Sequence, residues 1–204
     1  MRLLIGTSNP GKAAELAGYL APLGFELLTL ADLNLEPVEE TGESFEDNAI
    51  LKAKAYSAAS GLPTLADDAG LEVDALGGAP GVRTHRWLGE NVTDLKLFFA
   101  ILDRMKDVRR PKRTARLRVV LALAWPDGTV VTVSRSAEGV IVEADEARPD
   151  KIVEGYPFKS LLRLEVNGKL YCDLTEQEHA VHNHRARAIR DLLPELEALM
   201  PVEA

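Results

Sequence analysis

The segment Gly6-Thr-Ser-Asn-Pro-Gly-Lys12 constrains this chain more than any other feature. It follows the apolar run Leu3–Ile5 and precedes apolar residues at helical spacing, so we expect the chain to open as strand, glycine loop and helix. Such a loop turns backbone N–H groups and a lysine toward an anion. Ala13, however, stands where the P-loop pattern needs Ser or Thr for magnesium. The segment therefore predicts phosphate binding outside a true P-loop, with an ordinary glycine turn as the alternative.

Two acidic pairs could supply the missing metal ligands, Glu39-Glu40 and Asp67-Asp68. Magnesium prefers oxygen ligands and typically takes one or two protein carboxylates together with substrate phosphates. A carboxylate beside the ion can also act as a general base toward water. The ordinary alternative for Glu39 and Glu40 is a pair of solvated loop charges. Asp67 and Asp68 follow the apolar segment Leu65-Ala66 and precede a glycine, so we expect them at the end of a strand, at a sheet edge.

Basic residues near these motifs are candidates for holding an anion. A capping box formed by Ser44 and Asp47 predicts a helix that carries Lys52 and Lys54. Because the two lysines lie two positions apart they face different directions, and at most one can reach a common site. Solvent exposure is the ordinary state of such lysines. The later segment His182-Asn-His-Arg185 lacks further Cys or His residues for a metal site, so base or phosphate recognition suits it better.

The rest of the chain predicts hairpins and a last helix. Leu117–Trp125 and Thr129–Val133 flank a Pro-Asp-Gly turn, and Asn167-Gly168 signals a second hairpin. A capping box at Thr175 begins a final helix, which Pro194 ends or kinks. Helices intermixed with hairpins indicate a mixed α/β fold, in which helices flank a long, largely mixed or antiparallel sheet.

Composition limits the class of protein. With 204 residues the chain suits one domain, residues 1–204, and its net charge of −8 argues against a nucleic-acid partner. The single cysteine Cys172 cannot form an internal disulfide, and no signal-peptide pattern precedes the first strand. No apolar stretch approaches the roughly 18 residues of a membrane helix. We therefore expect a cytoplasmic protein without a membrane partner.

Several segments stand in a fixed order along the first half of the chain: Gly6–Lys12, Glu39–Gly42, Phe45–Ala53, Ala66–Leu71 and Asp74–Gly81. Together they resemble the inosine triphosphate pyrophosphatase family, the Ham1-like enzymes that remove deaminated purine nucleotides from the precursor pool. The resemblance implies an elongated, two-lobed α/β fold with the active site in its central cleft, and a homodimer. It also implies magnesium-dependent hydrolysis of a nucleoside triphosphate to the monophosphate and pyrophosphate.

The resemblance further implies the roles of individual residues. The triphosphate-binding residues that it implies are Thr7, Ser8, Asn9, Pro10, Gly11, Lys12, Lys52 and Ala69. The purine contacts that it implies are Gly155, Tyr156, His184 and Arg185. Magnesium would be held by Glu40 and Asp68. Asp68, with Asp67 beside it, would activate the water that attacks the α-phosphorus.

The sequence departs from the family pattern mainly in the part that would bind the base. Ala69 replaces a serine near the phosphates, Glu154 stands where an aromatic residue is usual, and Pro157 stands where an aspartate is expected. His179 and Asn183 replace a lysine and a serine. Since one aromatic stack is worth on the order of 1 to 3 kcal/mol per base, these changes could alter base preference without changing the chemistry.

Two other functions stay open at this point. One is a nucleotide-binding or regulatory protein on the same fold that lacks turnover. The retained Glu40, Asp67, Asp68 and Lys12 argue against it, because a simple binder needs no pair of metal and base. The other is a true P-loop kinase or NTPase, which Ala13 disfavours.

Overall fold

The computed structural model of the chain describes residues 1–89 and 92–200. The α-helices in these ranges are α1 (Pro10–Leu20), α2 (Phe45–Ser60), α3 (Asp94–Met105), α4 (Glu176–His182), α5 (His184–Asp191) and α6 (Leu193–Glu197). The strands in these ranges are β1 (Arg2–Ile5), β2 (Glu26–Thr29), β3 (Thr64–Val73), β4 (Thr114–Ala124), β5 (Val130–Ile141) and β6 (Leu162–Leu164). Within the described residues the strands form a six-stranded sheet in the order β2-β1-β3-β4-β5-β6.

The sheet contains both strand directions. β1 pairs in parallel with β2 and with β3, whereas β5 and β6 are antiparallel. Between β4 and β5, the turn closes with hydrogen bonds from Gly128 N to Trp125 O and from Trp125 N to Thr129 O, both 2.9 Å. This turn confirms the first predicted hairpin, and the mixed sheet with its flanking helices confirms the predicted mixed α/β class.

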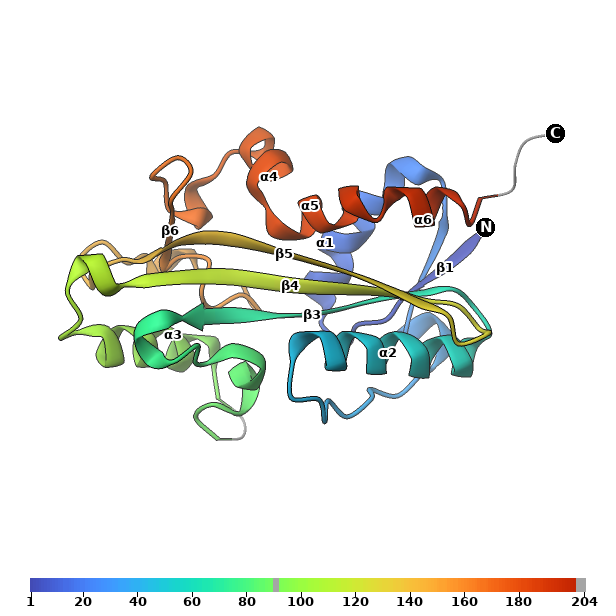
Figure 1. Cartoon of the computed structure of the whole chain (residues 1–204), viewed down its shortest axis with the longest axis horizontal. Coiled ribbons are helices and arrows are strands. Elements are labelled where there is room, and N and C mark those ends of the chain that lie inside the picture. The colour runs from blue at the N-terminus through green and yellow to red at the C-terminus, as the bar shows by residue number, and fades with distance from the viewer. Residues whose placement is uncertain (90–91, 201–204) are drawn as a thin grey trace. The chain divides into compact units, whose positions relative to one another are not determined.

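The chain divides into two compact units. The first unit comprises Met1–Asp68, Val119–Arg135 and Arg185–Ala204, and the second comprises Ala69–Arg118 and Ser136–His184. The strands β3, β4 and β5 contribute residues to both units. In the first unit α2 lies on one side of these strands and α6 on the other (Figure 1). That the chain forms a single domain stays a prediction.

Local sequence explains two helices of the first unit, α1 after the glycine loop and α2 further along the chain. The α1 helix begins with Asn9 as its N-cap and a proline in its first turn, and it buries Leu16 and Leu20, one turn apart. The α2 helix begins at the predicted capping box, in which Ser44 Oγ accepts from Asp47 N and the Asp47 side chain accepts from Ser44 N. The α1 helix therefore fixes the segment that carries Lys12, and the α2 helix fixes the segment that carries Lys52.

The second unit has its own apolar core. The α3 helix packs Leu97, Phe98, Ile101 and Met105 into it. Buried Arg113 is fully enclosed beside this core, where its guanidinium donates to the carbonyl oxygens of Met105, Ile141 and Val142. These charged hydrogen bonds connect the C-terminal end of α3 to the end of β5. Arg113 is thus a structural link within the unit.

The prediction that Asp67 and Asp68 end a strand at a sheet edge is wrong. β3 continues through both residues to Val73, and it lies between β1 and β4 in the sheet. The strand continues because buried Leu71 and Val73 extend its alternating pattern beyond the acidic pair, and that burial outweighs the turn tendency of Gly70. Two carboxylates therefore lie in the middle of an interior strand, where charged groups need partners.

Two predictions for the last third of the chain are only partly right. The turn at Asn167-Gly168 forms, with Leu164 N donating to Lys169 O at 2.8 Å, but Tyr171–Asp173 makes a 3₁₀ helix instead of a second strand. The final helix is divided into α4, α5 and α6. It breaks first at Asn183, whose backbone is extended at φ −64° and ψ 126°, and Pro194 lies in the first turn of α6.

Within residues 1–89 and 92–200, no helix has the length and apolarity needed to cross a membrane.

Candidate functional site

The glycine loop is stabilised by its own side chains. Asn9 N donates to Thr7 Oγ1 at 3.3 Å, and Lys12 N donates to Asn9 Oδ1 at 3.1 Å. The carbonyl oxygen of the Asn9 side chain thus caps α1, while Ser8 and Pro10 are exposed. A capped helix start presents backbone N–H groups and the positive end of the helix dipole at one place. The loop is therefore arranged to receive an anion.

Asp67 lies at the centre of a buried cluster of charges in the first unit. Its side chain is fully buried, and its Oδ2 accepts from Arg185 Nε at 3.3 Å and from Arg185 Nη2 at 3.1 Å. Lys12 Nζ lies 3.4 Å from the same oxygen, and Arg185 Nη1 lies 3.5 Å from Glu15 Oε2. Two cations therefore converge on one oxygen of one carboxylate.

The charge state of Asp67 follows from this arrangement. Burial alone would raise the pKa of the carboxyl, but the charges of Lys12 and Arg185 outweigh that effect and hold the pKa well below its usual range. Its other oxygen, Oδ1, is buried and finds no hydrogen-bond donor among the described residues. Because a buried unpaired oxygen is costly, this atom indicates a place for a donor or a cation.

A second group of charges surrounds Lys52. Its ammonium lies 2.5 Å from Glu40 Oε1 and 3.9 Å from Asp68 Oδ1, and its side chain is buried. Burial lowers the pKa of Lys52, but the neighbouring carboxylates, Asp67 and Asp68 foremost, raise it above its ordinary value overall. Lys54 is exposed, which confirms that only one of the two lysines points inward.

Asp68 differs from its neighbour in both burial and charge. Burial raises its pKa from 3.8 to about 6, and the charge of Glu40 adds to this, while Lys52, Lys12 and a hydrogen bond from Asn48 oppose it. A carboxyl with this pKa is ionised at neutral pH and is a stronger base than an ordinary aspartate. The two adjacent aspartates are therefore chemically distinct.

Asn48 is a further member of the site that the sequence analysis did not single out. It is completely buried, its Nδ2 donates to Asp68 Oδ2 at 3.1 Å, and its Oδ1 accepts from Gly42 N at 2.7 Å. A Cβ atom at Gly42 would lie only 2.6 Å from Asn48 Oδ1, so only glycine fits there. The sequence signal that could have identified Asn48 is its position as a polar residue on the apolar face of α2, between Phe45 and Ala49.

The second unit holds an aromatic and histidine cluster. The hydroxyl of Tyr171 and Nδ1 of His184 are 3.0 Å apart, and the Tyr171 ring meets His179 edge to face. Lys159 Nζ lies 3.6 Å from the ring centroid of Tyr156. Of these residues, Tyr156 and His184 were predicted as base contacts, whereas Tyr171 and Lys159 were not. No local pattern marks the last two as members of this cluster.

Comparison with known proteins shows the family to which the chain belongs. The model of the Ham1 family matches residues 3–195. The chain belongs to the Ham1 family. A protein of Thermus thermophilus named dITP/XTP pyrophosphatase is 43% identical over 193 residues, which cover 95% of this chain and 90% of that protein. A protein of the same name from Escherichia coli K12 is 36% identical, over 96% of this chain and 98% of that protein.

The chain is similar to solved structures as well. A HAM1 protein from Coxiella burnetii matches with a TM-score of 0.83 at 30% identity, over 97% of this chain and 99% of that chain. A nucleoside-triphosphatase, also named dITP/XTP pyrophosphatase, from Mycobacterium abscessus matches with a TM-score of 0.74 at 34% identity, over 95% of this chain and 100% of that chain.

The residues predicted for the site of this Ham1 protein fall into two groups. The first unit brings together the charged residues Lys12, Glu40, Lys52, Asp67, Asp68 and Arg185. The predicted loop residues Thr7 to Gly11 also belong to the first unit, and the second unit contains Ala69, Gly155, Tyr156 and His184. Gly155 takes a left-handed conformation at φ 78°, and its N–H donates to Asp94 Oδ2 at 2.7 Å. Apart from Ala69, the phosphate and metal candidates thus belong to the first unit, together with Arg185, and the remaining base candidates belong to the second.

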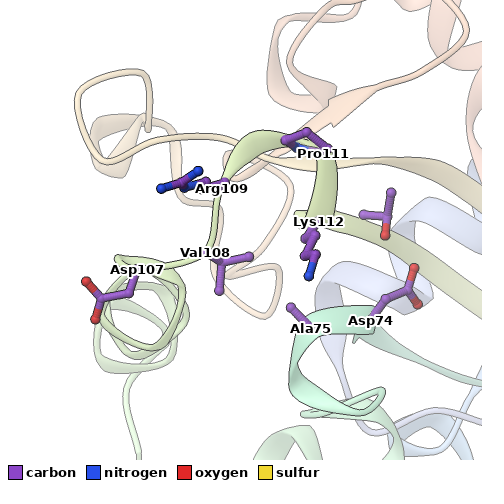
Figure 2. Close-up of a pocket in the computed structure, with 8 residues that line it drawn as sticks. Asp74, Ala75, Asp107, Val108, Arg109, Pro111 and Lys112 are labelled. Atoms are coloured by element: carbon purple, nitrogen blue, oxygen red, sulfur yellow. The ribbon is translucent and has the colours of Figure 1, made fainter.

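A hollow in the second unit of the Ham1 protein does not coincide with these residues. It has a volume of about 900 Å³ and lies between the turn at Asp74-Ala75 and the segment Asp107–Thr114. Figure 2 shows Lys112 pointing toward that turn, whereas Asp107 and Arg109 point away from it. No predicted site residue lines this hollow. This hollow is therefore separate from the predicted site residues.

Proposed function

We propose that this Ham1 protein hydrolyses nucleoside triphosphates of deaminated purines, such as ITP, dITP and XTP, to the monophosphate and pyrophosphate with the help of Mg²⁺. The observation that carries the proposal is the pairing of two buried lysines, Lys12 and Lys52, with the carboxylates of Asp67 and Asp68 beside a capped glycine loop. Relatives named dITP/XTP pyrophosphatase support the substrate class.

The lysines suit a polyphosphate because their charges are fixed in place. Lys12 and Lys52 are less than a tenth exposed, and both pair with carboxylates, Lys12 with Asp67 and Lys52 with Glu40. A polyphosphate that binds there exchanges hydrogen bonds with water for charged hydrogen bonds with the lysines. The first turn of α1 adds its partial positive charge. The local positive charge therefore offsets the net negative charge of the chain.

The residues also fit a magnesium ion. Glu40 and Asp68 both approach the Lys52 ammonium, so their oxygens lie near a common position that accepts a cation, and in the described part of the chain Asp67 Oδ1 has no donor. Among the described residues, no group of three or more His, Cys, Asp and Glu could hold a metal ion. Glu40 and Asp68 would therefore hold Mg²⁺ with the substrate phosphates, which suits the few protein ligands that this ion takes. When bound, Mg²⁺ supplies charge that neutralises the phosphate oxygens.

Asp68 is the base in the proposed reaction. It accepts a proton from the water whose oxygen attacks the α-phosphorus. The new P–O bond forms while the bond from the α-phosphorus to the bridging oxygen breaks, and pyrophosphate leaves. A pKa of about 6 lets Asp68 be ionised and still accept the proton at neutral pH. Asp67, whose pKa is depressed, holds Lys12 in position and does not serve as the base.

On the same family resemblance we propose that the second unit contacts the purine through Tyr156 and His184, and that the protein is a cytoplasmic homodimer. Tyr171 supports this role of His184, because its hydroxyl holds one ring nitrogen. Size-exclusion chromatography with light scattering tests the dimer: a single species of monomer mass would contradict it.

A panel of nucleoside triphosphates tests the function. Each of ITP, XTP, dITP, GTP and ATP is incubated with the protein and Mg²⁺, and monophosphate, pyrophosphate and orthophosphate are separated by ion chromatography. We expect pyrophosphate and monophosphate in equal amounts, formed faster from ITP or XTP than from ATP. Orthophosphate release would indicate a γ-phosphate hydrolase instead, and tight binding of a triphosphate that survives intact would indicate a regulatory protein.

A further inference from the structure

Glu40, one of the two proposed magnesium ligands, lies on a segment of the first unit that belongs to no helix or strand. We call residues 38–42, which lead toward the start of α2, the Glu40 segment. Fixing the backbone of a single residue costs roughly 1 to 2 kcal/mol in conformational entropy. A carboxylate on a loose segment is therefore a poor ligand, unless other contacts already hold the segment in place.

Two buried side chains of α2 bind the two ends of the Glu40 segment. At one end, Val38 N donates to Tyr56 Oη at 2.9 Å, and Val38 packs against the apolar cluster that includes the Tyr56 side chain. At the other end, Gly42 N donates to Asn48 Oδ1 at 2.7 Å. The segment therefore runs along α2 in the direction opposite to the helix, as can be followed in Figure 1.

The contacts between α2 and the Glu40 segment have matching spacings. On the helix the three side chains are four positions apart, which places them about 6 Å from one another along one side of α2. On the segment the three partners are two positions apart, and two residues of chain span at most about 7 Å. In order, the contacts are Asn48 with Gly42, Lys52 with Glu40, and Tyr56 with Val38. Because the spacings agree, all three contacts form together, and Glu40 is held at the middle one.

Asn48 also connects the Glu40 segment to Asp68, the second proposed magnesium ligand. A backbone N–H can only donate, so the atom of Asn48 that faces Gly42 N must be the amide oxygen. The amide nitrogen is then directed at Asp68, and Nδ2 donates to Asp68 Oδ2 at 3.1 Å. One side chain therefore fixes both an end of the segment and the orientation of the Asp68 carboxylate.

We propose that Tyr56 and Asn48 are positioning residues for magnesium binding. They hold the Glu40 segment along α2, so that the carboxylates of Glu40 and Asp68 reach one ion. The inference rests on the proposed function in taking these two carboxylates as the magnesium ligands. Tyr56 acts at a distance from the ion, because its hydroxyl binds the backbone two residues before Glu40.

Hydrogen exchange of the metal-free protein measures how firmly the segment is held. Tyr56→Phe keeps the ring but removes the oxygen that accepts from Val38 N. We expect this amide to exchange about two- to tenfold faster, the worth of one hydrogen bond. The matched control is Ser57→Ala, which removes a buried hydroxyl of the next residue that donates to Leu62 O and should leave the Val38 amide unchanged. Wild-type exchange of Val38 in Tyr56→Phe would overturn the proposal.

Binding of Mn²⁺, which suits the same oxygen ligands as Mg²⁺, measures the consequence for the metal. Free Mn²⁺ is followed by electron paramagnetic resonance during titration of the protein without nucleotide. The dissociation constant should rise about two- to tenfold in Tyr56→Phe, as for one hydrogen bond, and stay at the wild-type value in Ser57→Ala. An unchanged dissociation constant in Tyr56→Phe would contradict a positioning role.

A double-mutant cycle tests whether Tyr56 acts through Glu40. Glu40→Gln removes the carboxylate itself, so adding Tyr56→Phe to it should weaken Mn²⁺ binding by less than about twofold more. A merely structural role of Tyr56 would give additive losses, and these would count against the proposal.

Asn48→Ala tests the other end of the segment. It removes the acceptor of Gly42 N and the donor to Asp68, so we expect faster exchange of the Gly42 amide and weaker Mn²⁺ binding than in the wild type. Wild-type behaviour in both measurements would overturn the role of Asn48. Circular dichroism must show a folded protein; where Asn48→Ala is unfolded, Tyr56→Phe, which removes a single oxygen, decides whether α2 positions the segment.

Neither measurement needs a nucleotide, so the inference and the proposed function can fail separately. A wild type that binds Mn²⁺ but hydrolyses no triphosphate refutes the proposed function, while exchange and Mn²⁺ affinity still decide the role of Tyr56. A wild type that hydrolyses triphosphates, together with a Tyr56→Phe variant of wild-type exchange and Mn²⁺ affinity, refutes the inference alone.

Discussion

The candidate site residues of the two units differ in type. In the first unit, buried charges pair with one another at short distances: Lys12 with Asp67, Lys52 with Glu40 and Asp68. In the second unit, rings predominate, with Tyr171 against His184 and His179 and Tyr156 beneath a lysine. Few residue types can replace a buried charged group, because each buried charge needs its partner.

This contrast agrees with where the sequence departs from the family pattern. The first unit keeps the charged residues that the family resemblance implies for phosphate and metal, whereas Ala69, which replaces a serine near the phosphates, belongs to the second unit. The altered positions Glu154 and Pro157 belong to the second unit, where contacts to a flat ring can be supplied by several residue types. The comparison predicts that variants in the first unit affect all nucleotides alike, and that variants in the second change the ratios between bases.

The largest effect is expected for Asp68→Asn. The variant keeps the shape of the side chain but loses the proton acceptor, so kcat should fall by a factor on the order of 10² to 10⁴ for every nucleotide. Initial rates with ITP and XTP measure the loss, and a thermal melt shows that the variant is folded. Activity close to that of the wild type would remove Asp68 from its role as the base.

Next in size is the loss of the inward lysine of α2. Lys52→Met removes a buried ammonium from Glu40 and Asp68, so we expect kcat/KM to fall on the order of a hundredfold, equally for all bases. The matched control is Lys54→Met, which changes the exposed lysine of the same helix and should behave like the wild type. Equal losses in both variants, or a loss confined to one nucleotide, would break the proposed division between the units.

The pH dependence of stability sharpens the distinction between the two aspartates. The pKa of Asp68 is raised from 3.8 to about 6 in the folded protein, so folding binds a proton between these values. Asp68 therefore costs no stability below about pH 4, and the cost grows as the pH rises to 6, reaching at most about 3 kcal/mol. In metal-free buffer, urea unfolding should show Asp68→Asn gaining stability relative to the wild type over this range. A difference that is constant with pH would contradict the raised pKa.

The smallest effect is expected in the second unit. Tyr171→Phe removes the hydroxyl that holds His184 but keeps the ring, so we expect the preference between ITP and ATP to change by about fivefold, the worth of one hydrogen bond. Competition kinetics with both nucleotides measure this ratio. Pyrophosphate affinity should not change. A uniform loss for all ligands would show that Tyr171 supports the phosphate site as well.

Much of the fold is readable from local sequence because its causes are local. The N-cap of α1 at Asn9, the capping box at Ser44 and the turn before Thr129 each depend on residues within a few positions of one another. The course of β3 is not readable in this way. Its acidic and glycine residues suggest a turn, and only the burial of Leu71 and Val73 shows that the strand continues.

Prediction of the candidate site from the sequence has the same limit. Residue type and order along the chain indicated Lys12, Glu40, Lys52 and both aspartates as members of one site, and the structure brings them together. Asn48 was overlooked because a lone asparagine on a helix is ordinary until it is found buried between Gly42 and Asp68.

By itself, the sequence determined that the chain opens with a strand, a glycine loop and a helix, that a second helix is capped, and that at most one of its two lysines points inward, because these features follow from neighbouring residues. The tertiary structure decided how the two adjacent aspartates differ. Arg185, 118 positions beyond Asp67, neutralises that carboxylate, while burial beside Glu40 raises the pKa of Asp68. A pKa depends on the burial and charges that folding brings together, and these are not properties of adjacent residues.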